Sequence, residues 1–374
     1  MKGKHIIITR LFEFSGSNTH LKALIEFLRP ENVVLILEDP GQVQYLQNIA
    51  GGHRIAYRIK SRLHAYAHLN YKWTTNIKEL FFVVKSVLAI QLLSLRYRFA
   101  AVTICAVEPE KHLYLLWMPF SRVYYILHTT PNHRYSSFTS YSCNRKLGKS
   151  KQIITVSCSN KSLISKNWEI TTAKQQFIRV VYNCVMESEE ARQYRVLPRQ
   201  VNELCILTMG HLVAYKNPAI WLKVAKAVTG ARPGVCFIWL GNGPLLDTCR
   251  SAGQMEKNIV FKGAVTNVFD YLKAADIYYQ PSLHETHGIA VIEAMYQALP
   301  CVVSNVGGLP ESVQNGYNGD LVNPGDLKQQ VDVMLKLIDS PELRARYGAN
   351  SFKRYHEHFS FKRFTVQLHL IYNF

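Results

Sequence analysis

The fold class is clearest from the segment LCILTMG (204–210) and the two segments that follow it, NPAIWLKVAKAV (217–228) and VCFIWLGNG (235–243). The first and third are short apolar runs that end in glycine, while the middle one has apolar residues about one helical turn apart. This pattern predicts a strand, a helix and a second strand. Continuous apolar strands joined by a helix are typical of a parallel sheet that is buried on both faces.

The first half of the chain shows the same alternation. HIIIT (5–9) is followed by a Gly/Ser turn and by LKALIEFL (21–28), and further apolar runs have the same character. Those runs are NVVLILED (32–39), AAVTICAV (100–107), RVYYILH (122–128) and KQIITVS (151–157). The sequence therefore predicts an α/β protein with two Rossmann-like domains that face an interdomain cleft.

A polar seam near residues 186–203 sets the predicted boundary between these domains. The expected domains are residues 1–186 and 187–374, and a C-terminal helix near 360–374 is a candidate to pack back on the first domain. A length of 374 residues is sufficient for two such domains. The content of 48% hydrophobic and 19% charged residues is that of a globular protein and excludes a disordered or fibrous chain.

The net charge of +18 is distributed unevenly, because residues 1–186 carry +16 of it. Such a basic half predicts an acidic partner, and nucleic acid, anionic lipid and phosphorylated substrates all qualify. The eight cysteines occur singly, without a CxxC motif, so we expect reduced thiols in a cytoplasmic protein.

We expect no signal peptide and no membrane-spanning helix. The apolar run near the N-terminus covers only Ile6 to Ile8. The longest apolar stretches, around 80–95 and 113–127, are interrupted by polar residues and fall short of the ~20 residues that a spanning helix needs. The protein is expected to meet a membrane at its surface, if at all.

The sharpest motif is PSLHETHGIAVIEAMYQALPCVVSNVGGLPE (281–311). Glu285 and Glu293 stand eight residues apart, and Gly288 lies between them where an apolar helix should begin. The first turn of such a helix exposes backbone N–H groups that can bind a phosphate, and the carboxylates can bind sugar hydroxyls. An isolated pair of glutamates at this spacing is more often a helix cap and a solvated side chain.

Four further segments accompany this motif: GHLVAYKNP (210–218), GNGP (241–244), KAADIYYQPS (273–282) and VGGLPE (306–311). Together, from about residue 204 to 360, they resemble the donor-binding domain of the retaining GT-B glycosyltransferases of family four, the glycosyltransferases group 1. In the first half, four residues fall at the family's glycine loop, active-site histidine, strand-end serine and pre-linker Asn-Gly. They are Gly16, His128, Ser157 and Asn183.

The resemblance implies a role for each matching residue in the second half. Glu293 would hold the ribose of the nucleotide and Glu285 would face the donor sugar. The backbone amides of His287, Gly288 and Ile289 would meet the sugar hydroxyls and the diphosphate. Lys216 would contact the pyrophosphate.

In the first half, Gly16 would let a phosphate approach the first helix. His128 would act near the sugar and the acceptor, at the carboxyl end of a strand. A lone histidine at a strand end is more often structural, but the resemblance to the family favours an active-site role for His128.

His211 occupies the position where the family usually has arginine beside the lysine. A neutral imidazole offers one N–H donor where a guanidinium offers five and a fixed charge. Weaker diphosphate binding, pH-dependent binding and a different donor all remain open, as does the alternative that Lys216, the helix N-termini and Gly16 suffice. Two smaller departures are Cys184 and Ala298, each where the family commonly has glycine.

The family resemblance implies a metal-independent, retaining glycosyltransferase of the hexosyltransferase type. Lys216, helix N-termini and His211 would stabilise the departing diphosphate, which would help to deprotonate the acceptor on the same face. The chain has no DxD carboxylate pair, so we expect no metal. We expect no cofactor besides the nucleotide-sugar donor, a UDP- or GDP-sugar.

Residues 54–98 carry nine Lys/Arg, Glu79 as the single acidic residue, and interleaved aromatics. This composition is typical of a segment at an anionic membrane surface, although two solvated helices explain it as well. Nucleic acid is not expected, because it would leave residues 204–360 unexplained.

The expected function is therefore sugar transfer to a glycan or lipid-linked acceptor in cell-surface polysaccharide or lipopolysaccharide biosynthesis, at the inner face of the membrane. A soluble acceptor and a catalytically silent sugar-nucleotide-binding relative are the alternatives.

Overall fold

The computed structural model describes residues 4–9, 11, 16–37, 45, 84, 88, 91–92, 99–106, 109–117, 122–129, 137–186 and 204–372. The chain divides into an N-terminal unit, residues 1–183 with 365–374, and a C-terminal unit, residues 184–364. The division falls three residues before the predicted boundary. The reason is that Val185 already pairs with the C-terminal unit, through a bridge to Ser360 and as the acceptor for the Tyr355 hydroxyl at 3.0 Å.

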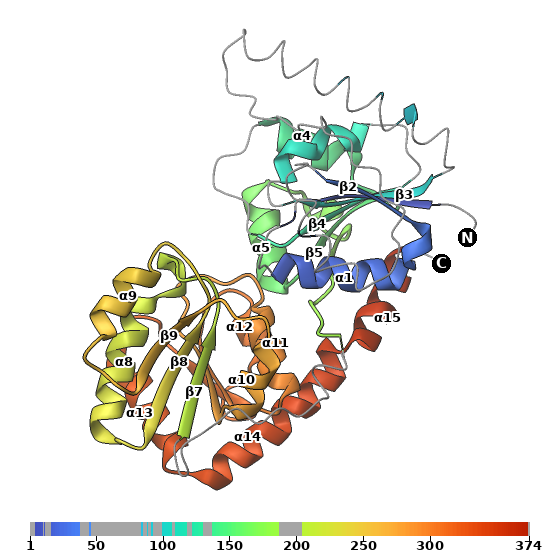
Figure 1. Cartoon of the computed structure of the whole chain (residues 1–374). Coiled ribbons are helices and arrows are strands. Elements are labelled where there is room, and N and C mark those ends of the chain that lie inside the picture. Colours follow the sequence, from blue (N-terminus) through green and yellow to red (C-terminus); the bar gives the residue numbers. More distant parts are fainter. Residues whose placement is uncertain are drawn as a thin grey trace. The chain divides into compact units, whose positions relative to one another are not determined.

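The N-terminal unit is built on a parallel sheet with the order β2-β1-β3-β4-β5-β6 (Figure 1). Its strands are β1 (Lys4–Thr9), β2 (Val33–Leu37), β3 (Phe99–Ala106), β4 (Val123–Leu127), β5 (Lys151–Thr155) and β6 (Ile178–Val180). β2 and β4 are buried along their whole length, as continuous apolar strands in a covered sheet should be.

Short helices flank this sheet. They are α1 (Gly16–Leu28), α4 (Ser137–Lys146), α5 (Cys158–Asn167), α6 (Thr172–Gln175) and the 3₁₀ segments η1 (Pro30–Asn32) and η3 (Pro109–Trp117). Helix α5 begins directly after β5 because the Ser157 hydroxyl accepts a hydrogen bond from the Asn160 amide at 3.0 Å.

The last helix, α15 (Phe361–Tyr372), returns the chain to the N-terminal unit from residue 365 onward. Its final residues bind β3 and β4. The Tyr372 hydroxyl lies 2.8 Å from that of Thr103, and the Arg122 guanidinium donates to the Tyr372 carbonyl at 2.8 Å. The Tyr124 hydroxyl donates to the Ile371 carbonyl at 3.2 Å.

The C-terminal unit has a second parallel sheet with the order β12-β11-β10-β7-β8-β9. Its strands are β7 (Leu204–Met209), β8 (Val235–Leu240), β9 (Ile259–Gly263), β10 (Ile277–Gln280), β11 (Cys301–Ser304) and β12 (Gly319–Val322). The chain runs outward from β7 in one direction to β9 and in the other, through β10, to β12. The reversal between β7 and β10 is the topological switch point, where open α/β sheets bind their ligands.

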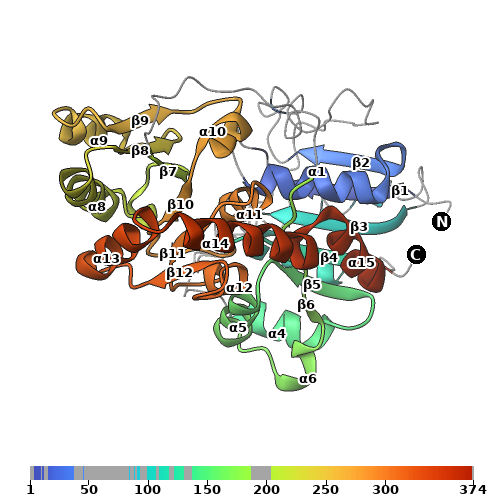
Figure 2. The same ribbon diagram turned by 90° about the horizontal axis from the view of Figure 1, so that it is seen from below.

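Helices cover both faces of this sheet (Figure 2). They are η4 (Ala214–Lys216), α8 (Pro218–Ala231), α9 (Leu246–Gly253), α10 (Val268–Ala274), α11 (Ile289–Tyr296), α12 (Leu309–Ser312), α13 (Leu327–Ile338), α14 (Pro341–Arg354) and the π-helical η5 (Tyr355–Phe359). Trp221 of α8 is fully buried and packs edge-on against Phe237 and Trp239 of β8. The Trp221 indole also donates to the Thr208 hydroxyl of β7 at 2.7 Å, so this residue joins α8 to both β7 and β8.

Among the described residues, no helix is both long enough and apolar enough to span a bilayer. All eight cysteines lie in described parts of the chain, and none of them forms a disulfide.

Candidate functional site

The loops that follow β7 and β10 meet at the switch point of the C-terminal sheet. The Leu283 amide donates to the Tyr215 carbonyl at 2.7 Å, which joins the two loops through their backbones. The Lys216 ammonium forms an ion pair with the Glu285 carboxylate, and their side chains are only 16% and 14% exposed. The structure thus brings together the two predicted residues that stand 69 positions apart in the sequence.

A third loop, with the sequence VGGLPE, contacts the backbone of Glu285. The Gly308 amide donates to the Glu285 carbonyl at 3.1 Å. A Cβ atom on Gly307 would lie 1.8 Å from that carbonyl oxygen, and the residue has φ of +54°. Only glycine therefore permits this close approach of the two backbones.

Helix α11 begins beside this loop. Its N-cap residue, Gly288, has the left-handed φ of +78°, and a Cβ there would lie 2.8 Å from the Leu309 side chain. The His287 imidazole is buried and contacts the Phe359 ring, with 5.5 Å between centroids. The predicted amides of residues 287–289 thus belong to the start of an eight-residue helix, where N–H groups lack intrahelical acceptors.

Glu293 lies in the second turn of α11. Its side chain retains partial exposure but is closely surrounded by protein, and this burial raises its pKa to about 7. The pKa of the neighbouring Tyr278 is raised well above its usual value by burial, then by Cys301 and by the carboxylates of Glu293 and Glu285. Both predicted carboxylates therefore lie near the same buried hydroxyl.

Two residues of β10 that the sequence analysis did not single out contact the site. Gln280 donates from its side-chain nitrogen to Glu285 at 2.8 Å and accepts from the Tyr278 hydroxyl at 2.9 Å. A polar residue at the end of the apolar run IYYQ, two positions after a tyrosine and on the same strand face, was the available signal.

His211 is exposed and lies on the β8 side of the β7 loop. Its Nδ1 atom is 3.3 Å from the Asn242 carbonyl, and the Leu212 amide donates to the same carbonyl at 2.9 Å. The GNGP segment thus packs against the loop that carries His211 and Lys216, and the two predicted motifs adjoin in space.

The N-terminal unit holds its own cluster at the carboxyl end of β4. The ring of His128 contacts that of His20 edge-on, with 4.5 Å between centroids, and His20 Nδ1 lies 2.9 Å from the Asn183 side-chain oxygen. Burial lowers the pKa of His20 to about 4. Burial, and then His20, lower the pKa of His128 well below its usual value.

His20 was missed because the turn FSGSNTH gave no sign that its last residue would face His128, 108 positions away. Gly16 is the exposed first residue of α1, on the helix that carries His20. Gly16, His128, Ser157 and Asn183 belong to the N-terminal unit. The C-terminal unit contains the other predicted residues, which are His211, Lys216, Glu285, His287, Gly288, Ile289 and Glu293.

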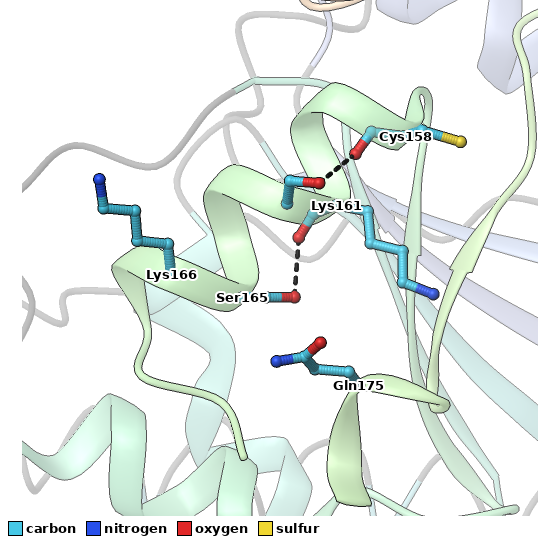
Figure 3. Close-up of a pocket in the computed structure, with 6 residues that line it drawn as sticks. Cys158, Lys161, Ser165, Lys166 and Gln175 are labelled. Carbon is cyan, nitrogen blue, oxygen red and sulfur yellow. Dashed lines mark hydrogen bonds between the residues drawn. The ribbon is translucent and has the colours of Figure 1, made fainter. Parts of the chain in front are cut away.

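A surface pocket of about 400 Å³ lies elsewhere in the N-terminal unit (Figure 3). Its lining comes from α5 and α6: Cys158, Lys161, Ser162, Ser165, Lys166 and Gln175. The hydroxyls of both serines donate to carbonyls of their own helix, at 3.0 and 2.8 Å. This pocket contains none of the predicted site residues.

Two predictions concern absent or undescribed features. The basic segment 54–98 lies outside the described residues, except for positions 84, 88 and 91–92. Within the parts of the chain that the structure describes, no group of three His, Cys, Asp or Glu side chains could hold a metal ion. The prediction of a metal-independent reaction remains a prediction.

Comparison with known families identifies the C-terminal region. Residues 189–354 match the family model of the glycosyl transferases group 1. Over 155 residues, 40% of each chain, the protein is 27% identical to the UDP-Gal:alpha-D-GlcNAc-diphosphoundecaprenol alpha-1,3-galactosyltransferase of Escherichia coli. Over 151 residues, 40% of this chain and 39% of the relative, it is 30% identical to the N-acetyl-alpha-D-glucosaminyl L-malate synthase of Bacillus anthracis.

The chain thus spans about 40% of the length of these curated relatives. Its fold matches a solved structure over almost the whole chain. HepE of Anabaena, crystallised in complex with UDP, superimposes with a TM-score of 0.75 at 16% identity, covering 98% of both chains. The predicted family resemblance and the α/β, GT-B fold class are confirmed.

Proposed function

Because residues 189–354 match the family model of the glycosyl transferases group 1, we propose that this protein transfers a sugar from a nucleotide-sugar donor to a glycan or lipid-linked acceptor. The observation that carries the proposal is the Lys216–Glu285 pair at the switch point of the C-terminal sheet, beside the start of α11. A cation, helix amides and carboxylates in one place match the chemistry of a sugar diphosphate.

The donor assignment carries the roles implied by the family resemblance onto this arrangement. Lys216 and the α11 amides bind the diphosphate, Glu285 binds hydroxyls of the donor sugar, and Glu293 binds the ribose. The complex of Anabaena HepE with UDP supports a uridine nucleotide as the first donor to test.

The reaction separates positive charge on the sugar from negative charge on the diphosphate. Lys216 and the helix N-terminus stabilise the departing diphosphate, and His211 adds one donor from the same loop. The transfer retains the anomeric configuration, because the diphosphate deprotonates the acceptor on the face that it leaves. We propose that no divalent metal takes part.

We propose a lipid-linked acceptor at the inner membrane face, in the assembly of a cell-surface polysaccharide or lipopolysaccharide. Two observations support this choice. The relative from E. coli is named for a diphosphoundecaprenol acceptor, and residues 1–186 carry most of the positive charge, which favours an anionic surface.

A soluble acceptor is the second candidate, because the relative from B. anthracis is named for L-malate. A catalytically silent sugar-nucleotide binder is the third, because His211 replaces the usual arginine.

A donor panel tests the proposal. The protein is incubated with UDP-, GDP- and ADP-sugars, with a lipid-linked acceptor, with a soluble acceptor and with neither, and nucleotide release is measured. We expect release from one donor that rises with the lipid-linked acceptor. Release only with the soluble acceptor would support the second candidate, and binding without release from any donor would support the silent relative.

A further inference from the structure

A hydrogen-bond chain runs from β10 to the Glu285 carboxylate. The hydroxyl of Tyr278 donates to Oε1 of Gln280 at 2.9 Å, and Nε2 of Gln280 donates to Oε2 of Glu285 at 2.8 Å. Gln280 is 2% exposed and Tyr278 is fully buried. This hydrogen-bond chain therefore lies inside the protein and ends at the proposed sugar-binding carboxylate.

The chemistry of the three groups fixes the direction of this chain. An ionised carboxylate only accepts hydrogen bonds, so the amide nitrogen of Gln280 must face Glu285 and its oxygen must face Tyr278. The Tyr278 hydroxyl supplies the proton that this oxygen needs. Gln280 itself is the last residue of β10 and pairs with Val303 of β11, so the sheet holds its backbone.

This hydrogen-bond chain determines which oxygen of the Glu285 carboxylate is already occupied by protein donors. Oε2 accepts from both Gln280 and Lys216, whereas Oε1 has no hydrogen-bond partner among the described residues. One oxygen therefore tethers the carboxylate, and the other is left to accept a hydroxyl from a ligand.

We propose that Gln280, oriented by Tyr278, is a positioning residue that holds the Glu285 carboxylate for the donor sugar. The role rests on the proposed function. When a diphosphate engages Lys216, the ammonium becomes shared between the two anions, and a neutral donor on a buried strand still holds Glu285 in place. An ion pair alone would not hold it in that state.

The same strand supplies a matched control. Tyr279 points to the other face of the sheet, and its hydroxyl donates to Oε1 of Gln330, a fully buried residue of α13. Nε2 of Gln330 donates to the Asn323 carbonyl at 2.8 Å. The two Tyr–Gln pairs are chemically alike, but only the pair of Tyr278 and Gln280 ends on Glu285.

The experiment compares Gln280→Met with Gln330→Met, in kinetics of sugar transfer and in thermal melting. Methionine preserves the length of the side chain and removes both hydrogen bonds. We expect Gln280→Met to lower kcat by ~10- to 100-fold, the range for residues that orient a reacting group. The KM for the donor should change much less, because Lys216 and Glu293 remain. Gln330→Met should lower the melting temperature comparably and leave kcat close to that of the parent.

Tyr278→Phe and Tyr279→Phe repeat the comparison with smaller changes, should the methionine variants fail to fold. Tyr278→Phe removes only the hydroxyl that orients Gln280, so it should lower kcat while Tyr279→Phe should not. An unchanged kcat in Gln280→Met or Tyr278→Phe would overturn the inference, as would equal losses of kcat in the two members of a matched pair. A parent protein that is inactive with every donor would instead refute the proposed function.

Discussion

The ionisation of Glu293 distinguishes most directly between a binding role and a structural role for this residue. Its pKa is raised from 4.5 to about 7 by burial, so the folded state holds the proton more tightly than the unfolded state does. The contribution of protonated Glu293 to the free energy of unfolding is therefore complete below pH 4.5 and is lost as the pH rises through 7. A carboxylate that destabilises the fold at neutral pH is expected where function requires it.

Glu293→Gln should remove this pH dependence. Relative to the parent, the variant should gain ~3 kcal/mol of unfolding free energy between pH 4.5 and pH 8, at 1.36 kcal/mol per pKa unit. It should also bind nucleotide more weakly, because the amide offers a weaker acceptor to the ribose. Urea unfolding at several pH values and nucleotide titration measure both effects. A stability difference that is independent of pH would contradict the assignment.

Two buried histidines of the N-terminal unit, His20 and His128, should stay neutral across the physiological range. Burial lowers the pKa of His20 to about 4 and that of His128 well below its usual value. His128 should therefore act as a neutral imidazole and not as a cation. Nitrogen NMR of the ring atoms between pH 5.5 and 8 should show no imidazolium at either residue. An imidazolium signal at pH 6 from His128 would refute this expectation.

The residues of the candidate site differ in how far the sequence could predict them. Lys216, Glu285 and Glu293 stand in motifs whose order along the chain resembles a known family, so the sequence alone predicts them. Gln280 is not predicted in this way, because a glutamine at the end of an apolar run, even two positions after a tyrosine, is a weak signal that an ordinary strand end also shows. Its role depends on the β10 loop turning Glu285 back toward it, which only the folded loop determines.

At the scale of elements, apolar periodicity predicted the alternating strands and helices, because buried strands and amphipathic helices impose it directly on the sequence. The order of strands in each sheet was not predictable in this way. The switch point between β7 and β10 results from long-range pairing, as between Ile206 and Ile277.

The C-terminal helix yields a prediction at this scale. Tyr372 is buried in the N-terminal unit, binds Thr103 through its hydroxyl and packs against Tyr124 with 4.3 Å between ring centroids. Tyr372→Ala should destabilise this unit by ~3 to 5 kcal/mol, as truncation of a buried aromatic does, and Tyr372→Phe by ~1 kcal/mol. Calorimetric melting measures both. Equal stability of Tyr372→Ala and the parent would show that α15 does not anchor the unit.

At the scale of the whole molecule, the charge asymmetry separates the proposed tasks of the two halves. Residues 187–374 are almost neutral and contain the donor motifs, where a few placed groups suffice. Residues 1–186 carry +16, and the acceptor and the membrane surface are assigned to them by proposal.

Vesicle flotation tests the membrane assignment. The protein should float with vesicles that contain anionic lipid and remain unbound with neutral ones, and binding should fall as salt rises, because the attraction acts over only about a Debye length of ~10 Å at 0.1 M. Binding that ignores both lipid charge and salt would contradict it.

The proposed transfer of a sugar from a nucleotide donor depends on the Lys216–Glu285 pair. The most direct measurement is acceptor-dependent transfer of a labelled sugar by the parent, by Lys216→Met and by the control Lys328→Met. Lys328 is 87% exposed and pairs with Asp332 on α13, so its loss removes a lysine of the same charge from outside the site. We expect Lys216→Met to lose ~10²- to 10³-fold in kcat, as when one stabiliser of developing charge is removed, and Lys328→Met to match the parent. Transfer by Lys216→Met at the rate of the parent, or no transfer by the parent from any nucleotide sugar, would contradict it.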